Sequence, residues 1–375
     1  MEKTLRIIIS GGGTGGHIFP AISIANAIKA LNPSADILFV GAEGKMEMEK
    51  VPTAGYSIKA LPVVGFHRRI TAKNLSFPFK LLRSMKLAKN IVKEFNPHVA
   101  VGVGGYASGP ILKVAQNMGI PTLIQEQNSY AGVTNKLLAK KANVICVAYE
   151  GMDKYFPKDK IVLTGNPIRQ GLNHVNSLTA EAHEFFGIPS GNKAILVVGG
   201  SLGARTINES ILKGIDKLAE LNGVTLLWQT GKLYHDNVKQ NLAGKDYGNI
   251  KVFDFINRMD YAYSVANVVV SRAGACTISE LCLVGKPTIL VPSPNVAEDH
   301  QTKNALALAN RAAAIMITDF DAPKKLVDQA ISLISDDNKQ KELGQNIGKM
   351  ALPNADKDIA QKVLELSRVN GTKTN

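Results

Sequence analysis

The sequence contains little cysteine, and its three thiols, Cys146, Cys276 and Cys282, supply neither a disulfide framework nor a CxxC pair. This spacing excludes the common cysteine-based metal sites and favours free thiols in a reducing compartment. Long apolar runs are also missing. No stretch reaches the roughly 18–20 apolar residues that cross a bilayer, and residues 1–10 lack the apolar core of a signal peptide. We therefore expect a cytosolic protein whose contact with a membrane is peripheral.

Acidic residues are scarce relative to basic ones: 31 Asp and Glu stand against 44 Lys and Arg, and the net charge is +13. Such a surplus predicts a basic surface, for which the candidate partners are nucleic acid, an anionic membrane or a phosphorylated substrate. The composition is otherwise that of a globular protein, with 45% hydrophobic and 20% charged residues. A chain of 375 residues is long enough for two domains with separate cores.

The chain opens with a pattern of strand, glycine-rich turn and helix. An apolar run at residues 5–10 is followed by GGGTGGH, by a helical pattern over 20–31 and by a strand at 36–40. The glycines match the G-x-G-x-x-G turn of dinucleotide-binding domains, but Glu43 comes too late to be the acidic residue of such a site. A NAD site does not need an imidazole at the position of His17, directly after the glycines. It is either a helix-capping histidine or a group at a reacting centre.

Residues 66–93 carry eight basic side chains and no acidic one. Apolar residues are interleaved with them, and an apolar face beside a cationic face suits an anionic membrane surface. A solvated helix with Leu82, Met85 and Ile91 in the core is the first alternative. Nucleic acid ranks last, because the chain has no recognised nucleic-acid-binding motif and few aromatic residues. The residues predicted to meet the membrane are Arg68, Arg69, Phe77, Phe79, Lys80 and Arg83.

Further strands are predicted at 99–103, before the turn GGYASGP, and at 121–125. Glu126, Gln127 and Asn128 follow the second of these strands, at the carboxyl end where open α/β sheets bind ligands. After GNPIR and a polar stretch to residue 177, the pattern of the N-terminus restarts with a strand at 194–198 and GGSLGA. The sequence therefore predicts an α/β protein with two doubly wound, Rossmann-like domains that face a cleft. The predicted segments are a membrane-facing domain over 1–166, a nucleotide-binding domain over 167–338 and C-terminal helices over 339–375; the resemblance described below implies that the first binds the acceptor and the second a UDP-sugar.

Residues 267–304 hold the strongest candidate for a nucleotide site. A strand at 267–270 leads through the turn 273–275 into a helix, whose first N–H groups have no intrahelical partners and attract phosphate. Glu280, one turn further on, is placed to accept hydrogen bonds from a ribose diol, and the polar loop 298–301 follows the next strand. The alternative is an ordinary turn of an α/β sheet without a ligand.

The sequence lacks the motifs of several classes of enzyme. The chain has no P-loop lysine pattern, no G-x-S-x-G elbow and no histidine–cysteine cluster, so a kinase, a serine hydrolase and a metal site are not expected. Asp319-Phe320-Asp321 resembles the D-x-D metal motif of some sugar transferases, and we interpret it as a surface turn.

Seven motifs, in this order along the chain, resemble the MurG family: GGGTGGH, GGYASGP, EQNSYAGVTNKLL, GNPIR, GGSLGA, WQTG and SRAGACTISE. These are the UDP-N-acetylglucosamine:undecaprenyl-pyrophosphoryl-muramoyl-pentapeptide N-acetylglucosaminyltransferases of peptidoglycan synthesis. The resemblance implies the glycosyltransferase B fold, with the C-terminal helices packed back on the N-terminal domain. It also implies inverting transfer of N-acetylglucosamine from its UDP donor to the muramoyl 4-hydroxyl of lipid I, which gives lipid II at the cytoplasmic face of the bacterial inner membrane.

The resemblance further implies roles for residues at matching positions. His17 would be the base for the acceptor hydroxyl, since an imidazole with its ordinary pKa of about 6.5 suits that role. Glu280 would hold the ribose, and the Ile256 backbone would read the uracil. The other donor-binding residues would be Thr14, Gly15, Gly16, Asn128, Arg169, Ser201, Ala275, Cys276, Thr277, His300 and Gln301. Further residues of the cleft, on the acceptor side, would be Gly13, Tyr106, Glu126 and Gln127.

Two positions depart from the family pattern: His300 stands where the family often has Gln, and Gln125 where it often has His. The implied partners are UDP-N-acetylglucosamine, lipid I, an anionic membrane surface and proteins of cell-wall synthesis. No bound cofactor is implied, and stimulation by a divalent cation stays open. The alternatives are a lipid glucosyltransferase, a UDP-N-acetylglucosamine 2-epimerase and a non-catalytic UDP-sugar-binding membrane subunit.

Overall fold

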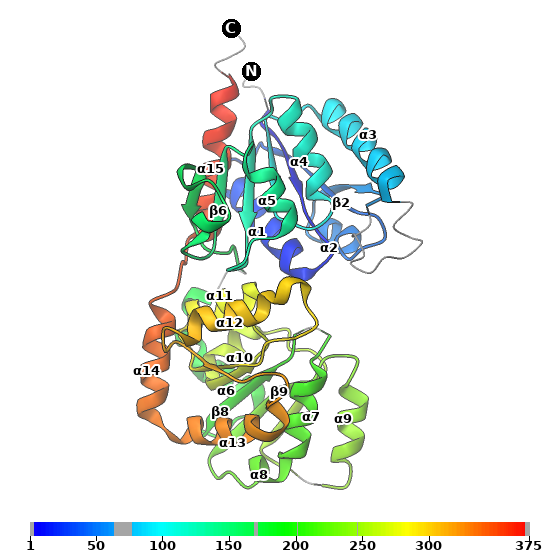
Figure 1. Ribbon diagram of the computed structural model, residues 1–375. Coiled ribbons are helices and arrows are strands. Elements are labelled where there is room, and N and C mark those ends of the chain that lie inside the picture. Colours follow the sequence, from blue (N-terminus) through cyan, green and yellow to red (C-terminus); the bar gives the residue numbers. More distant parts are fainter. Residues whose placement is uncertain (1–3, 64–76, 169–171, 201, 246, 372–375) are drawn as a thin grey trace. The chain divides into compact units, whose positions relative to one another are not determined.

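The computed structural model describes residues 4–63, 77–168, 172–200, 202–245 and 247–371. These residues form two units. One consists of the chain before residue 170 together with the stretch from 354 onward, and the other is 170–353. Each unit is built on one parallel sheet with packed helices (Figure 1). This arrangement confirms the predicted pair of Rossmann-like α/β domains.

The sheet of the first unit has the strand order β3-β2-β1-β4-β5-β6-β7, and every pairing is parallel. β1 is apolar on both faces, because Ile7 and Ile9 join the core beneath α1 while Ile8 joins the core beneath α4. The chain leaves the adjacent strands β1 and β4 toward opposite faces, which makes a switch point of the kind that binds ligands. The strands are β1 (Arg6–Ser10), β2 (Asp36–Ala42), β3 (Ser57–Leu61), β4 (Val99–Gly102), β5 (Thr122–Glu126), β6 (Val144–Val147) and β7 (Ile161–Leu163). The helices are α1 (Gly15–Leu31), α2 (Glu47–Thr53), α3 (Phe77–Phe95), α4 (Ser108–Asn117), α5 (Val133–Ala139) and α15 (Ala355–Gly371).

The second unit repeats this plan with the strand order β10-β9-β8-β11-β12-β13, again wholly parallel. Its switch point lies between β8 and β11. In its core, Trp228 is fully buried and donates from Nε1 to Oδ1 of Asn208 on α7 (3.0 Å). The strands are β8 (Lys193–Val198), β9 (Val224–Gln229), β10 (Ile250–Phe253), β11 (Ala266–Ser271), β12 (Thr288–Leu290) and β13 (Ile315–Met316). The helices are α6 (Thr179–Phe186), α7 (Arg205–Lys213), α8 (Ile215–Ala219), α9 (His235–Leu242), α10 (Met259–Val265), α11 (Ala275–Val284), α12 (His300–Ala309), α13 (Ala322–Ser335) and α14 (Asp337–Gly348).

The C-terminal stretch that the sequence analysis treats as one segment, 339–375, divides between the two units. Leu343 of α14 is buried in the core of the second unit. α15 instead packs along α1, and its Ile359 and Val363 are fully buried in the core of the first unit. The division follows from the apolar faces of the two helices, each of which is covered by a different sheet domain.

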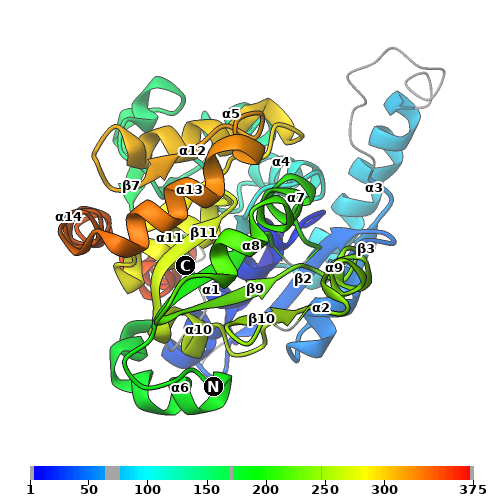
Figure 2. The ribbon, with the colours of Figure 1, turned by 90° about the horizontal axis from the view of Figure 1, so that it is seen from below.

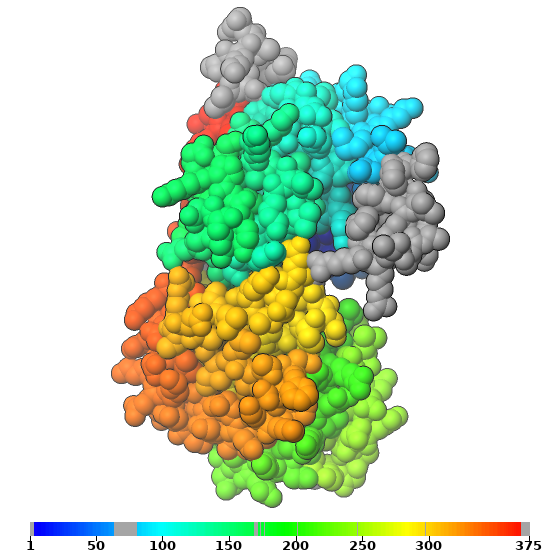
Figure 3. Space-filling model, viewed as in Figure 1, coloured from blue at the N-terminus to red at the C-terminus, as the bar shows by residue number. Residues whose placement is uncertain are grey.

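α3 lies beside α4 at the outer edge of the first unit, next to β3 (Figures 1 and 2). Ile91 is buried, as the core alternative requires, and Met85 is half-buried. Leu82 differs, because 68% of it is exposed, and exposed Leu81 lies beside it in the sequence. The basic side chains Arg83, Lys86, Lys89 and Lys93 are exposed on the same helix, which forms part of the outer surface in Figure 3.

All three cysteines are free, as predicted. Burial raises the pKa of Cys146 and of Cys282 to about 12, so both thiols stay protonated near neutral pH.

Candidate functional site

The glycine-rich turn of the first unit places His17 beside a second turn. The turn follows β1, and α1 begins at Gly15, five residues earlier than predicted, with Thr14 at the N-cap position. Nδ1 of His17 lies 3.2 Å from Oγ1 of Thr14. The ring lies against Gly104, the turn after β4, where a Cβ atom would lie 2.9 Å from Nε2 of His17. A residue with a side chain at position 104 would collide with the imidazole of His17, so glycine is needed for the ring to lie at the switch point.

The loop after β5 is ordered by a buried carboxylate. Glu126 accepts hydrogen bonds from the N–H groups of Asn128 (3.1 Å) and Gly132 (2.9 Å) and from Nδ2 of Asn135 (2.8 Å). Burial raises the pKa of Glu126, and these hydrogen bonds oppose that rise. Gln127 is also buried and donates to the Val103 carbonyl (2.8 Å).

The side chains of Glu126 and Gln127 therefore support the loop after β5 from inside the protein. Of the other residues predicted on this side, Asn128 is half-buried, whereas Tyr106 and Gly13 are exposed. Gln125, which stands where the family often has His, donates to Oδ1 of Asn166 (3.0 Å) and belongs to the same buried network.

In the second unit, Gln229 joins two loops at the carboxyl edge of the sheet. Its Nε2 donates to the Gly200 carbonyl (3.1 Å), and its Oε1 accepts from the Ile256 N–H (2.8 Å). Ile256 is the residue predicted to read uracil through its backbone. Because Gln229 already takes this N–H group, a uracil that uses it must first displace the Gln229 amide. The sequence analysis did not identify Gln229.

α11 begins one residue past Gly274 and supplies the predicted helix N-terminus. Ala275, Cys276 and Thr277 form its first turn and are half-buried. Glu280 lies in the second turn of this helix. Its carboxylate is buried and accepts a hydrogen bond from the Tyr263 hydroxyl (3.0 Å).

The polar loop after β12 ends at α12, which begins at His300. Gln301 accepts a hydrogen bond at Oε1 from the Ser293 N–H (2.9 Å), so its side chain orders the proline-containing loop. His300 is half-buried at the start of this helix. Glu298 and Asp299 have φ of 58° and 52°, a left-handed backbone that turns the chain sharply into α12.

An ion pair that the sequence analysis missed joins the loops after β11 and β12 to the start of α7. Arg272 donates to Asp319 (2.5 Å) and to the carbonyls of Val291 (3.0 Å) and Pro292 (3.1 Å). Asp319 also accepts from the Thr206 hydroxyl at the start of α7 (2.8 Å). The side chains of Arg272 and Asp319 are only 15% and 21% exposed. Asp319-Phe320-Asp321 form a turn before α13, as predicted, and Phe320 is 85% exposed, whereas the half-buried side chain of Asp319 joins this turn to Arg272 and Thr206.

Asp321, the other acid of the D-x-D sequence, accepts from the Thr318 hydroxyl (3.0 Å) and pairs with Lys325 (3.4 Å) at the start of α13. Its pKa is lowered, chiefly by the Thr318 hydrogen bond. Both carboxylates of the motif are thus engaged by side chains of the protein.

We expect Asp319→Asn to lower the free energy of unfolding by about 2 kcal/mol, the scale of a lost hydrogen bond to a charged group. It should also weaken binding of the UDP predicted from the sequence, because Arg272 joins the loops after β11 and β12 that carry the predicted donor-binding residues. Urea denaturation and calorimetry measure the two effects. The matched control is Asp328→Asn, since the Lys217–Asp328 pair is about 60% exposed and contributes little. Equal effects of the two substitutions would show that the Arg272–Asp319 pair contributes no more to stability than an exposed ion pair.

The remaining predicted residues cannot all be placed. Arg68, Arg69, Arg169 and Ser201 lie outside the described residues. Phe77, Phe79 and Lys80 belong to α3, of which only the backbone is described at these positions. Within the described ranges, no three His, Cys, Asp or Glu side chains gather closely enough to hold a metal ion. No helix in the described part of the chain is long and apolar enough to span a membrane.

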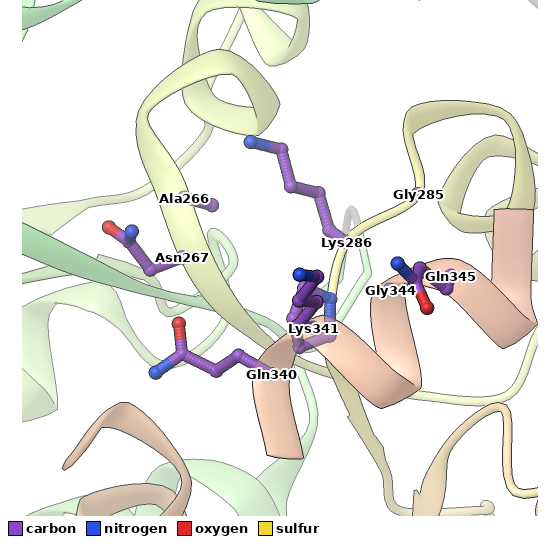
Figure 4. A pocket seen from close by; sticks show the side chains of 9 residues that line it. Ala266, Asn267, Gly285, Lys286, Gln340, Lys341, Gly344 and Gln345 are labelled. Atoms are coloured by element: carbon purple, nitrogen blue, oxygen red, sulfur yellow. The ribbon is translucent and has the colours of Figure 1, made fainter. Parts of the chain in front are cut away.

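A separate cavity of about 360 Å³ lies in the second unit, lined by α14 and by the residues around Lys286 (Figure 4). β11 and β12 begin next to it, so it lies at the opposite edge of the sheet from the turns described above. Lys286 points away from Lys341 in Figure 4 and donates to the Ser264 carbonyl (3.1 Å). Burial lowers the pKa of Lys286 to about 8. The cavity is not part of the candidate site.

The comparisons with known proteins cover almost the whole chain. Residues 7–147 match the glycosyltransferase family 28 N-terminal domain, and residues 194–363 match the C-terminal domain of the same family. A protein of Phocaeicola vulgatus is 58% identical over 368 residues, 98% of each chain. It is described as a UDP-N-acetylglucosamine–N-acetylmuramyl-(pentapeptide) pyrophosphoryl-undecaprenol N-acetylglucosamine transferase. The crystal structure of Acinetobacter baumannii MurG superposes with a TM-score of 0.78 at 27% identity, over 96% of this chain and 99% of that one. The chain belongs to the MurG family.

Membership of the MurG family confirms the resemblance carried by the seven sequence motifs and makes the chain a glycosyltransferase. A UDP-N-acetylglucosamine 2-epimerase from Neisseria meningitidis also superposes, with a TM-score of 0.65 over 97% of this chain and all of that chain. Its sequence identity is 12%, so this likeness shows the shared fold alone. The epimerase alternative therefore has no support beyond architecture, whereas the MurG assignment has identity along the full chain.

Proposed function

We propose that this MurG-family chain transfers N-acetylglucosamine from UDP-N-acetylglucosamine to the muramoyl 4-hydroxyl of undecaprenyl-pyrophosphoryl-MurNAc-pentapeptide. The observation that carries this proposal is the 58% identity, over 98% of both chains, to a protein described as that transferase. The product is lipid II, an intermediate of peptidoglycan synthesis, a process on which cell shape and division depend.

Two chemical needs define the reaction. The acceptor oxygen forms a bond to C1 of N-acetylglucosamine while the bond from C1 to the β-phosphate oxygen breaks, and the configuration at C1 inverts. The hydroxyl proton must pass to a base, and the departing UDP must have its growing negative charge stabilised.

We assign the removal of the acceptor hydroxyl proton to the turn after β1. His17 takes the proton, and Thr14 holds the imidazole through Nδ1, where the two atoms are 3.2 Å apart. Gly13 and Tyr106 are assigned to the acceptor side, and Gly15, Gly16 and Asn128 to the donor. The buried Glu126 and Gln127 hold the loop that presents Asn128.

We assign stabilisation of the departing UDP chiefly to the second unit. The N-terminus of α11, with Ala275, Cys276 and Thr277, faces the diphosphate, because the helix dipole favours negative charge at this end of the helix. Arg169, which precedes the second unit in the chain, and Ser201 also contact the diphosphate, and Glu280 holds the ribose diol. Ile256 reads the uracil, while His300 and Gln301 contact the N-acetylglucosamine.

The test is transfer of labelled N-acetylglucosamine from its UDP donor to a short-chain lipid I analogue by the purified protein. We expect a disaccharide-pentapeptide product. Transfer to diacylglycerol instead would favour a lipid glucosyltransferase, and conversion of the donor to its 2-epimer would favour an epimerase. Donor binding without turnover on any lipid acceptor would favour a binding subunit.

We further propose that α3 rests on the cytoplasmic face of the bacterial inner membrane, where lipid I is anchored. The supporting observation is the exposure of Leu81 and Leu82 next to a row of exposed Lys and Arg side chains. Each basic residue near an anionic surface adds about 1 kcal/mol, and buried apolar area adds to this. Proteins of cell-wall synthesis are further proposed partners at this surface.

We expect Leu82→Glu to lower partitioning onto anionic phospholipid vesicles by about tenfold, because 1.4 kcal/mol corresponds to that factor and an inserted leucine contributes roughly 1.5–3 kcal/mol. Sedimentation with vesicles measures the effect. Leu31→Glu, at an exposed leucine of α1 (49% exposed), is the matched control. Transfer to a water-soluble acceptor should be unchanged in both variants. Equal loss of vesicle binding in the two would argue against α3 as the membrane-contacting helix.

A further inference from the structure

Glu47, the first residue of α2, is buried beneath the glycine turn that carries His17. Only 1% of Glu47 is exposed. Its carboxylate accepts hydrogen bonds from the Gly13 N–H, at 3.1 Å and 3.0 Å to its two oxygens, and from the Ala42 N–H at 2.9 Å. The side chain of Glu47 thus joins the end of β2 to the turn after β1. Glu47 and Gly13 are 34 residues apart in the sequence.

The glycines around this carboxylate leave the space that it fills. A Cβ atom at Gly12 would lie 2.1 Å from Oε1 of Glu47, and one at Gly41 would lie 2.5 Å from its Cγ. On its other side the turn meets the loop after β4, where a Cβ atom at Gly105 would lie 2.3 Å from the Gly12 carbonyl oxygen. The turn is therefore enclosed between the Glu47 side chain and the β4–α4 loop, and no side chain larger than hydrogen fits at these three positions.

A glycine-rich segment loses more conformational entropy on ordering than any other, about 1–2 kcal/mol for each residue fixed. Gly13, with φ of +88°, is the last residue before Thr14 at the N-cap of α1, and His17 lies in the first turn of that helix. A carboxylate that accepts the Gly13 N–H through both oxygens fixes this point of the chain before any ligand arrives. Hydrogen bonds to a charged acceptor are roughly twice as strong as neutral ones.

We infer that Glu47 is a positioning residue for transfer: its buried carboxylate holds the Gly13 turn so that Thr14 and His17 stand in the reactive geometry. This inference rests on the proposed function for the role of His17, whereas the contact between Glu47 and Gly13 does not. Glu47 itself touches no substrate. Its effect passes through the backbone of the turn to the imidazole, where a displacement of about 1 Å can cost on the order of 100-fold in rate.

The experiment compares Glu47→Ala and Glu47→Gln with Glu49→Gln in the full-length protein. Glu49 lies on the same helix, but its side chain is 76% exposed and pairs with Lys50, so its variant controls for loss of a charge from α2. We expect Glu47→Ala to lower kcat for transfer by about 10- to 100-fold. Glu47→Gln should lose less, because its amide oxygen still accepts one N–H. Binding of UDP, measured by calorimetry, and the rate of Glu49→Gln should stay within twofold of the wild type.

A double-mutant cycle separates positioning from a general loss of stability. If Glu47 acts through His17, adding Glu47→Ala to His17→Ala should cause no further fall in kcat, since the group being positioned is already gone. Multiplicative losses in the double variant would overturn the inference, as would an unchanged kcat in both Glu47 single variants.

Hydrogen exchange at the Gly13 amide gives a readout that does not depend on transfer. We expect this amide to exchange at least tenfold faster in Glu47→Ala than in the wild type, while the amides of α15 keep their protection. Unchanged exchange at Gly13 would overturn the inference. Faster exchange in a protein whose wild type transfers no sugar would instead refute the proposed function and leave the contact intact.

Discussion

Replacing His17 by alanine is expected to lower kcat for transfer by about 10²- to 10⁴-fold, the range that a positioned general base contributes. The acceptor hydroxyl is a poor nucleophile until its proton is taken. The His17 ring is placed for this task by Thr14 on one side and by the Gly104 backbone on the other. Donor binding belongs chiefly to the second unit, so the dissociation constant of UDP should change by less than threefold. Single-turnover assays with a lipid I analogue, together with calorimetry, measure the two quantities.

The pH dependence distinguishes a base from a residue that only positions the acceptor. An imidazolium cannot accept a proton, so the wild-type rate should fall as the pH is lowered and the His17 imidazole becomes protonated. In His17→Ala this acid limb should disappear along with most of the rate. His174→Ala, at an exposed histidine of the second unit, is the matched control and should keep both rate and profile. A His17→Ala enzyme with a normal kcat and a raised acceptor KM would show that His17 binds the acceptor without taking its proton.

The strands on which the site is built could be predicted from the sequence, because buried parallel strands read as short apolar runs. Two strands lack this apolar signal for physical reasons. β3, Ser57–Leu61, is an edge strand with a lysine in its middle, and β13 has only two residues. The start of α1 was predicted at Pro20, because the six glycine-rich residues 11–16 before His17 are typical of a loop. The helix nonetheless begins within them, at Gly15.

The candidate site was predictable where one motif supplies it and unpredictable where distant side chains meet. The turn with His17 and the helix with Glu280 are each contained in one continuous stretch of sequence. The contact of Glu47 with Gly13 and that of Arg272 with Asp319 join residues 34 and 47 positions apart. Their formation depends on how loops from neighbouring strands cross, which no local pattern encodes. The acidic residues were present in the sequence, but nothing in their own segments distinguished Glu47 from Glu43 or Glu49.

Replacing Glu280 by alanine is expected to raise the dissociation constant of UDP by about 10- to 100-fold. A carboxylate that accepts hydrogen bonds from a ribose diol contributes about 1.5–3 kcal/mol, and each 1.4 kcal/mol corresponds to a factor of ten. Because Glu280 is buried and accepts a hydrogen bond from Tyr263, the substitution also removes an internal contact. The affinity must therefore be measured by calorimetry at a temperature where thermal unfolding shows every variant to be folded.

Two further variants separate the ribose contact from the internal one. Tyr263→Phe removes the donor of the 3.0 Å hydrogen bond and leaves the carboxylate in place. It should lower the melting temperature about as much as Glu280→Ala, while UDP still binds within threefold of the wild-type affinity. Glu280→Gln keeps the shape and an acceptor oxygen but loses the charge, so its affinity should lie between those of the wild type and the alanine variant. If Tyr263→Phe weakened UDP binding as strongly as Glu280→Ala, the role of Glu280 would be to pack α11 against α10, and the ribose would have to be held by another residue.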